Sequence, residues 1–318
     1  MENDLLLDEP RLHLCALLGR GGMGSVWTAR YDGAPTDVAV KVTLAGHVSD
    51  DARARLRREA RALALAAGPQ VVRLLSDRTS APTPFLVMEK LEGAPLSAHT
   101  TPTSRLPLDE IRAVLVQLGW GLGRLHAAGI IHADVKGDNV VLVRNGGAPE
   151  PVLIDFGVAR TKGEEPLDSD AQPAGTPRHM PPEQALEPMR PTQRWDTWAL
   201  AVLAYQLLTG RTPFEADDVG SILCRALAGE YVAPSAWVST LTPEVDAVFA
   251  EAFAAEPDAS YASVGGFVHA LVTALAEVAS FPEGAEHASA TTVRPRGPRA
   301  TRVSALAPTR LHREMVIA

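Results

Sequence analysis

Residues 132–139 read His-Ala-Asp-Val-Lys-Gly-Asp-Asn, and Asp155-Phe156-Gly157 follows sixteen residues after Asn139. The carboxylate of Asp134 can take up the proton of a hydroxyl group, and the ammonium of Lys136 can hold a phosphate. Asn139 and the aspartate of the second motif offer oxygen ligands that can hold magnesium from two sides. A base, a cation and two metal ligands at this spacing predict phosphoryl transfer, and two such motifs in order rarely arise by chance.

A glycine-rich stretch lies near the N-terminus, where 19–26 read Gly-Arg-Gly-Gly-Met-Gly-Ser-Val. The missing Cβ atoms of Gly19, Gly21 and Gly24 let backbone amides approach phosphate oxygens. β-prone runs flank the stretch at 12–18 and 25–30, which predicts a hairpin and not the strand–helix unit of a dinucleotide-binding fold. A strand is predicted at 37–44, and its Lys41, seventeen residues beyond the last glycine, can reach the α- and β-phosphates of a nucleotide.

The remaining pattern places strands mainly before residue 93 and helices after it. A helix is predicted at 50–67, capped by Ser49 or Asp50, and a strand at 85–88. Apolar residues at helical spacing follow Pro107, with Asp109 as the expected cap. The segment 198–208 is apolar on every face, as in a helix buried at the centre of a lobe, and a further helix is predicted to begin at Thr242-Pro243.

These motifs resemble those of the protein kinases, and the chain looks like a bacterial member of the eukaryotic-like Ser/Thr protein kinases. The resemblance covers residues 12 to about 275 in the correct order. It implies an α+β, bilobal protein kinase fold, with a small antiparallel-sheet N-lobe that carries one main helix and a larger, mostly helical C-lobe. The implied organisation is an N-terminal extension (1–11), a kinase domain (12–280, divided into lobes at 92/93) and a basic tail (281–318). We expect this tail to be largely disordered; a basic docking segment is the less favoured alternative.

The resemblance also implies a reaction. ATP would donate a phosphoryl group, with Mg²⁺ or, as a substitute, Mn²⁺, to Ser or Thr hydroxyls of protein substrates, and the chain would phosphorylate itself in bacterial signalling. Asp134 is expected to be the catalytic base and Lys136 the γ-phosphate contact; a lysine two residues after the base resembles Ser/Thr kinases. Asn139 and Asp155 are the implied magnesium ligands. Asp138 is acidic too, but by resemblance its position points away from the metal.

Residues of the first lobe are assigned by the same resemblance. Glu59 is the only acid beyond the first turn of the expected helix 50–67, and it is expected to hold Lys41. The alternative is an ion pair between Glu59 and an arginine of its own helix. Met88 is the expected gatekeeper, and the Glu89 carbonyl and Leu91 amide are expected to bind adenine. The implied ATP-binding residues are Gly19, Gly21, Gly24, Val26, Ala39, Lys41, Met88, Glu89, Leu91 and Val141.

The chain between Asp155 and Glu183 has the composition of an activation segment. Thr176, near its end, is expected to hydrogen-bond to Asp134 and Lys136 and to help select a Ser or Thr acceptor. The expected autophosphorylation sites are the hydroxyls in its mobile part, Thr161 and Ser169. Beyond the segment, Asp196-Thr197-Trp198 resembles the start of the central helix of the second lobe, with its carboxylate bracing the backbone of the catalytic loop.

Three positions depart from the family pattern. Ala133 replaces an arginine that normally pairs with a phosphorylated residue of the activation segment, so activity is expected not to depend strongly on phosphorylation there. His179 stands where relatives usually carry tyrosine. Ser260 stands where an arginine usually pairs with the glutamate at Glu183. Three arginines are candidates for that role, and the sequence does not choose among them: Arg190, Arg194 and Arg211.

Composition limits the other classes of function. The net charge of −8 argues against a nucleic-acid binder. Cys15 and Cys224 do not match a metal or redox spacing, so buried, reduced thiols are expected. The acidic first ten residues do not resemble a signal peptide, and no long apolar run predicts a membrane span, which favours a cytoplasmic protein. The oligomeric state is left open.

Two alternatives to an active protein kinase remain. A pseudokinase scaffold would bind nucleotide or partners without turnover, but a decayed site would be expected to lose at least one of the residues named above. A small-molecule phosphotransferase of the aminoglycoside-kinase kind shares the His-x-Asp-x-x-x-x-Asn pattern. Lys136, the glycine-rich stretch and the segment 180–183 favour a protein substrate instead.

Overall fold

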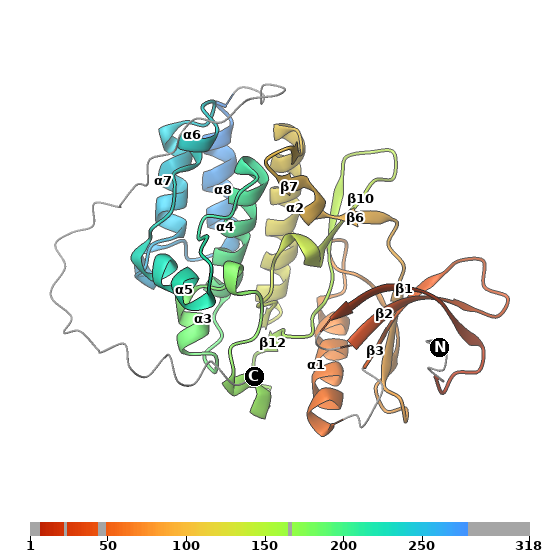
Figure 1. The fold of residues 1–318 in the computed structure, drawn as a ribbon. Coiled ribbons are helices and arrows are strands. Elements are labelled where there is room, and N and C mark those ends of the chain that lie inside the picture. The colour runs from red at the N-terminus through yellow and green to blue at the C-terminus, as the bar shows by residue number, and fades with distance from the viewer. Residues whose placement is uncertain (1–6, 22–23, 44–48, 165–166, 279–318) are drawn as a thin grey trace.

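A computed structural model describes residues 7–21, 24–43, 49–164 and 167–278 of the chain. Figure 1 shows a β-sheet with one long helix beside it and, on the other side, a larger group of helices. This two-part arrangement is the predicted α+β architecture. The basic tail and the predicted domain boundary at residue 280 lie outside the described residues.

Five antiparallel strands form the sheet of the first part, in the order β1-β2-β3-β5-β4. β1 and β2 are the predicted hairpin around the glycine-rich stretch. Every residue of β3 is buried because the strand lies at the centre of the sheet, and Lys41 is paired with Leu86 of β5. The strand β4 was not predicted. The bounds are β1 (Leu12–Gly21), β2 (Gly24–Tyr31), β3 (Val38–Val42), β4 (Leu74–Arg78) and β5 (Phe85–Glu89).

The helix of the first part, α1 (Asp50–Ala66), contacts β4 and β5. Ser49, one of the two predicted caps, accepts a hydrogen bond of 3.1 Å from the amide of Ala52. This bond satisfies one of the amide groups that have no partner within the helix. The buried face of α1 includes the charged residues Arg58 and Glu59, which therefore must find partners inside the molecule.

Helices dominate the second part. The central helix α4 (Gln193–Thr209) is buried on nearly every face, as predicted, and contacts α2, α7 and α8. The segment from Pro243 begins a helix with Thr242 at the N-cap, also as predicted. The other helices are α2 (Leu108–Ala127), α3 (Pro182–Leu186), α5 (Val219–Ala228), α6 (Pro234–Trp237), α7 (Pro243–Ala252) and α8 (Val264–Leu275).

Short strands join the helices to the site. β10 pairs with β11 on one side and with β6 on the other, and β9 pairs with β12. Because β9 ends at Ile131 and β10 begins at Val140, these strands fix both ends of the segment 132–139. The bounds are β6 (Gly93–Pro95), β7 (Thr100–Thr101), β8 (Ser104–Arg105), β9 (Ile130–Ile131), β10 (Val140–Val143), β11 (Glu150–Leu153) and β12 (Arg160–Thr161).

Two local predictions are wrong. Asp109 is not the cap of α2, because the helix begins at Leu108 with Pro107 at the N-cap. Asp109 instead lies in the first turn, where its charge suits the helix dipole and where it binds Arg112 at 2.7 Å. Cys15 and Cys224 are exposed and not buried. Cys15 lies on β1 and Cys224 on α5, and both elements have buried and exposed faces. The residue type alone does not tell which face a cysteine occupies.

One apolar core runs through both parts of the molecule. It includes Phe156, Leu63 of α1, Met88 of β5 and Leu200 of α4. A smaller cluster covers the other face of the first sheet. No helix in the described ranges is both long and apolar enough to cross a membrane. The shared core holds the sheet, α1 and the segment 132–139 in fixed positions.

Candidate active site

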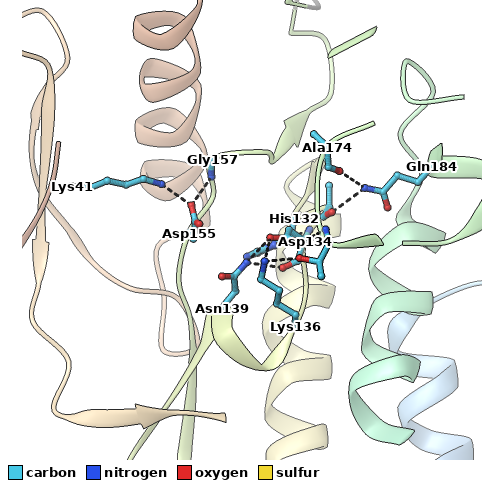
Figure 2. A network of polar contacts seen from close by, with 11 residues as sticks. Lys41, His132, Asp134, Lys136, Asn139, Asp155, Gly157, Ala174 and Gln184 are labelled. Atoms are coloured by element: carbon cyan, nitrogen blue, oxygen red, sulfur yellow. Dashed lines mark hydrogen bonds and ion pairs between the residues drawn. The ribbon is translucent and has the colours of Figure 1, made fainter. Parts of the chain in front are cut away.

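Lys41 lies at the meeting point of the two parts. Its Nζ atom donates to both carboxylate oxygens of Glu59 in α1, at 2.7 and 2.8 Å, and to Oδ1 of Asp155 at 2.6 Å. The predicted ion pair with Glu59 is therefore present, and not the alternative within α1. Figure 2 shows Lys41 extending from the sheet toward Asp155. One ammonium thus connects β3, α1 and the Asp-Phe-Gly motif.

Burial and ion pairing oppose each other at these groups. Burial lowers the pKa of Lys41, but the carboxylates of Glu59 and Asp155 outweigh it and hold this pKa above its usual value. Burial raises the pKa of Asp155, yet the Lys41 ammonium outweighs it and the pKa lies below its usual value. Lys41 and Asp155 are therefore both charged at neutral pH, as phosphate and metal binding require.

Asp134 sits in a second network, on the loop between β9 and β10 (Figure 2). Its Oδ2 atom accepts from Asn139 Nδ2 and pairs with Lys136 Nζ, both at 2.8 Å. Its Oδ1 atom accepts from the amide of Thr176 at 2.8 Å. Lys136 also donates to the Thr176 hydroxyl at 2.6 Å. The predicted contacts of Thr176 are present, although it reaches Asp134 through its backbone amide and not its hydroxyl.

Asp196, at the start of α4, holds the backbone of this loop. Its carboxylate accepts from the amides of His132 at 2.9 Å and Ala133 at 2.8 Å, as predicted. A third bond, of 2.8 Å, joins it to Nε2 of His126 in α2. Ala133 has a φ of +65°, which is strained for a residue with a Cβ atom. The buried carboxylate therefore holds the residue before Asp134 in a conformation it would not adopt alone.

The donor set suits magnesium. Asn139 and Asp155 supply amide and carboxylate oxygens, the hard ligands that Mg²⁺ prefers, and the Ile154 amide bonds to the Asn139 carbonyl at 2.9 Å, which keeps the two ligands close. Among the described residues, no three His, Cys, Asp or Glu side chains gather as a metal site. Two protein ligands leave room for phosphate and water oxygens, as is usual for Mg²⁺ bound with a nucleotide.

The glycine-rich hairpin suits a phosphate-bearing ligand. A Cβ atom at Gly19 or Gly21 would meet no atom within 4 Å, so this part of β1 has open space beside it. Gly24 is different, because its Cβ would lie 2.2 Å from the Val42 carbonyl oxygen. Its glycine is thus required by the approach of β3, a structural reason in addition to the predicted phosphate contact.

The residues predicted to surround adenine lie on connected elements. Ala39 and Met88 face the core on adjacent strands β3 and β5, where they are register partners. Glu89 ends β5, and Leu91 lies between β5 and β6, which pairs with β10. Three of the predicted residues pack partly buried against the same core: Val26, Leu91 and Val141. Their contact with adenine stays a prediction.

A comparison with protein families agrees with this geometry. The model of the protein kinase domain matches residues 12–252. The chain belongs to the protein kinase family. The predicted bilobal kinase fold is confirmed.

Curated bacterial kinases are similar over most of the chain. Serine/threonine-protein kinase Pkn1 of Myxococcus xanthus is 38% identical over 265 residues, which cover 82% of this chain and 38% of that protein. PknH of Mycobacterium tuberculosis H37Rv is 34% identical over 266 residues, 83% of this chain and 42% of that protein. PknL of Mycobacterium tuberculosis CDC 1551 is 31% identical over 300 residues, 92% of this chain and 74% of that protein. The chain spans about two fifths of the length of Pkn1 and PknH.

The resemblance implied an arginine at Ser260 as the partner of Glu183, and the structure shows which cation pairs with Glu183 instead. Arg194 of α4 binds the Glu183 carboxylate and also donates to the Ala254 carbonyl at 2.6 Å. The two other candidates are engaged elsewhere, Arg190 with Glu187 and Arg211 over the Trp237 ring. Of the three candidates, Arg194 of α4 therefore supplies the cation for Glu183.

The second departure, His179, is buried and linked to Gln206 of α4 at 3.0 Å through Nε2. Burial lowers the pKa of His179, so the ring is neutral at physiological pH. The residue therefore acts as a neutral hydrogen-bonding side chain beneath the end of the activation segment.

The predicted phosphorylation sites are placed differently by the kinase fold. Thr161 lies in β12, paired with Ile130 of β9, and not in an irregular part of the segment. Its hydroxyl is buried and has no hydrogen-bond partner among the described residues. Ser169 lies in the 3₁₀ helix η3 (Asp168–Ala171), but its side chain is outside the described part. Phosphorylation of Thr161 would require β12 to separate from β9.

Some residues around the kinase site were not anticipated from the sequence. Gln184 donates to the carbonyls of Ala133 at 3.0 Å and Ala174 at 2.9 Å, which ties the catalytic loop to the activation segment (Figure 2). His126, the third partner of Asp196, comes from α2. Neither carries a motif or a spacing signal, because each contact joins residues far apart in the chain.

A separate cavity of about 590 Å³ lies beside the activation segment. Its lining includes Arg58 of α1, Arg160 of β12, Asp170 and His126, and none of the residues of the phosphate-transfer networks. The chain thus has a polar space beside the activation segment that is separate from these networks.

Proposed function

We propose that this chain transfers the γ-phosphoryl group of ATP to Ser or Thr hydroxyls of proteins, itself included. Residues 12–92 and 93–280 would form its two lobes. The observation that carries the proposal is the network around Asp134, in which Asn139, Lys136 and Thr176 fix one carboxylate. This carboxylate is the base, and the neighbouring cation can neutralise the transferred phosphate.

The residues divide the work between binding and transfer. Lys41, held by Glu59, would bind the α- and β-phosphates, and the amides of the glycine-rich hairpin would surround them. Mg²⁺, held by Asn139 and Asp155, would neutralise the charge that develops on the phosphate oxygens. Asp134 would accept the proton of the attacking hydroxyl. Thr176, bonded to both Asp134 and Lys136, supports a Ser or Thr acceptor because it keeps these two groups side by side.

The test is transfer of labelled γ-phosphate from ATP and magnesium, to the chain itself and to a generic basic protein. Asp134→Asn keeps the size of the side chain but removes the base, so label on Ser and Thr should disappear. Asp138→Asn is the matched control, because Asp138 is exposed in the same loop, and this variant should keep its activity.

The alternatives give different results. ATP binding without transfer by the wild-type chain would indicate a pseudokinase scaffold. Transfer to an aminoglycoside but not to any protein would indicate a small-molecule phosphotransferase. Equal labelling of the wild-type chain and Asp134→Asn would contradict the assigned base. Cytoplasmic signalling stays a prediction from the sequence.

Autophosphorylation is expected in the activation segment, at Thr161 or Ser169. Because the Thr161 hydroxyl is buried in β12, we expect its modification to be slow and Ser169 to be labelled first. Phosphopeptide mapping of the labelled chain over time measures this order. Label found only within 281–318 would contradict both sites.

A further inference from the structure

Asp170, in the 3₁₀ helix η3 of the activation segment, is a buried carboxylate held by two arginines. Both of its oxygens lie within 2.9 Å of Nη1 of Arg58, and Oδ1 lies 3.0 Å from Nη2 of Arg160. Oδ2 also accepts from the amide of Leu167 at 2.9 Å. The exposed fractions of the three charged side chains are only 8% for Asp170, 5% for Arg58 and 13% for Arg160.

The two arginines come from elements that lead directly to the active site. Arg58 belongs to α1 and precedes Glu59, the partner of Lys41. Arg160 belongs to β12, which pairs with β9 immediately before the catalytic loop, with Arg160 opposite Ile131. Figure 1 shows β12 beside α1. Asp170 therefore ties the later part of the activation segment to the helix that supplies Glu59 and to β12, earlier in the same segment, which pairs with the strand before the catalytic loop.

The physical chemistry favours a permanent tether. A buried charge is costly unless it is paired, and here each oxygen of Asp170 has at least two donors. An aspartate side chain carries its carboxylate from synthesis, whereas a phosphorylated residue needs a covalent modification before it can bind arginine. Screening by salt is weak because the groups are buried. The tether thus forms when the chain folds and does not wait for a phosphate.

A second acid reinforces the arrangement. Glu164 lies 3.3 Å from Nε of Arg58 and 3.5 Å from Nη1 of Arg61. Ala133, by contrast, offers no cation to the segment; it contributes only its amide, bound to Asp196, and its carbonyl, bound to Gln184. The cations that hold the segment therefore come from α1 and β12 and not from the catalytic loop.

We propose that Asp170 is a positioning residue: its ion pairs to Arg58 and Arg160 hold α1 so that Glu59 stays on Lys41, and the kinase is active without a phosphate on its activation segment. This proposal rests on the proposed kinase function. It explains how activity can be independent of phosphorylation at a site where Ala133 cannot bind a phosphate.

The experiment compares variants of the full chain. Asp170→Asn keeps the shape and the acceptor for Leu167 but removes the charge, and Asp170→Glu keeps the charge. Arg58→Met removes the partner on α1. Arg57→Met is the matched control, because Arg57 is exposed on the same helix. We measure kcat/KM for phosphoryl transfer, amide hydrogen exchange of 50–66, and the melting temperature.

We expect Asp170→Asn and Arg58→Met each to lower kcat/KM by about tenfold or more and to speed exchange in α1. Asp170→Glu should recover most of the loss, and the double variant Arg58→Met/Asp170→Asn should be no worse than the poorer single variant, since the two residues act as a pair. Arg57→Met should stay within about twofold of wild type. Treatment of the wild-type chain with phosphatase should leave kcat/KM unchanged.

Other outcomes would overturn the proposal. If Asp170→Asn lowers only the melting temperature, with normal kcat/KM and normal exchange in α1, the carboxylate is merely structural. A large loss of wild-type activity after phosphatase treatment would show that a phosphate is needed. If the wild-type chain transfers no phosphate at all, the proposed function fails, while exchange in α1 still decides whether the tether exists.

Discussion

Replacing Asp196 by asparagine should uncouple the catalytic loop from α4. The carboxylate is fully buried and accepts three hydrogen bonds, from the amides of His132 and Ala133 and from Nε2 of His126. Asparagine has the same shape but only one acceptor oxygen, and its amide group is a donor. In either orientation at least one of the three donors therefore faces another donor.

The magnitude follows from these three bonds. A buried amide left without a partner costs about 1–3 kcal/mol, and each bond that remains loses about 1 kcal/mol because its acceptor is no longer charged. Removal of a buried charge offsets part of this loss. We expect the free energy of unfolding of Asp196→Asn to fall by about 2–4 kcal/mol, out of the roughly 5–15 kcal/mol typical of a domain.

Activity should fall as well, because Ala133 would relax from its strained φ and carry Asp134 with it. A displacement of about 1 Å in an active site can cost about a hundredfold in rate, so we expect kcat/KM to fall by about tenfold to a hundredfold. Unfolding in urea, followed by intrinsic tryptophan fluorescence, measures the first effect, and phosphoryl transfer well below the unfolding midpoint measures the second.

A control separates loss of stability from loss of geometry. Asp246→Asn removes the charge of another helix carboxylate, which binds Ser235 at the start of α6, away from the loop. It should lower stability without lowering kcat/KM. The reasoning is refuted if Asp196→Asn unfolds within about 0.5 kcal/mol of wild type, or if it keeps full activity despite a loss of stability.

Three further changes test other parts of the structure. Arg194→Met should lower the free energy of unfolding by about 2–3 kcal/mol, because it leaves Glu183 without its cation in a partly buried position. Arg190→Met, which breaks an exposed ion pair, should lower it by less than about 0.5 kcal/mol. Urea unfolding measures both. Gly24→Ala should cost about 2 kcal/mol or more and raise KM for ATP, because its φ is +153° and its Cβ would lie 2.2 Å from a carbonyl oxygen of the next strand. The free energy of unfolding of His179→Gln should fall less than that of the wild-type chain when the pH is lowered from about 7 to about 5. The folded-state pKa of His179 lies below the unfolded value of 6.5, so the stability it contributes is present above that value and is lost as pH falls, when the unfolded chain takes up the proton more readily.

Each of these predictions has a contrary result. Equal stability of Arg194→Met and Arg190→Met would mean that Glu183 is satisfied by solvent. A Gly24→Ala variant with wild-type stability would show that β3 can move away from the hairpin at little cost. The same acid dependence in His179→Gln and wild type would place the responsible titration in another group.

Local sequence patterns account for much of this fold and of its candidate site. The hairpin around the glycine-rich stretch, the capped helix α1 and the buried helix α4 follow from turn chemistry and periodicity, which act between near neighbours. Lys41, Asp134, Asn139 and Asp155 were found because their spacing along the chain is constrained by the reaction. Asp109 shows the limit of local patterns. A helix cap depends on the backbone conformation of a single residue, and in α2 the N-cap is Pro107.

What the amino-acid sequence determined by itself is therefore the main elements around the two motifs, the family and the residues of these motifs. Tertiary structure alone decided which arginine holds Glu183, that Gln184 and His126 support the catalytic loop, and that Asp170 binds Arg58. These pairs are separated by 11 to 112 residues. No periodicity relates residues at such separations, since their meeting depends on how whole strands and helices pack around the shared core.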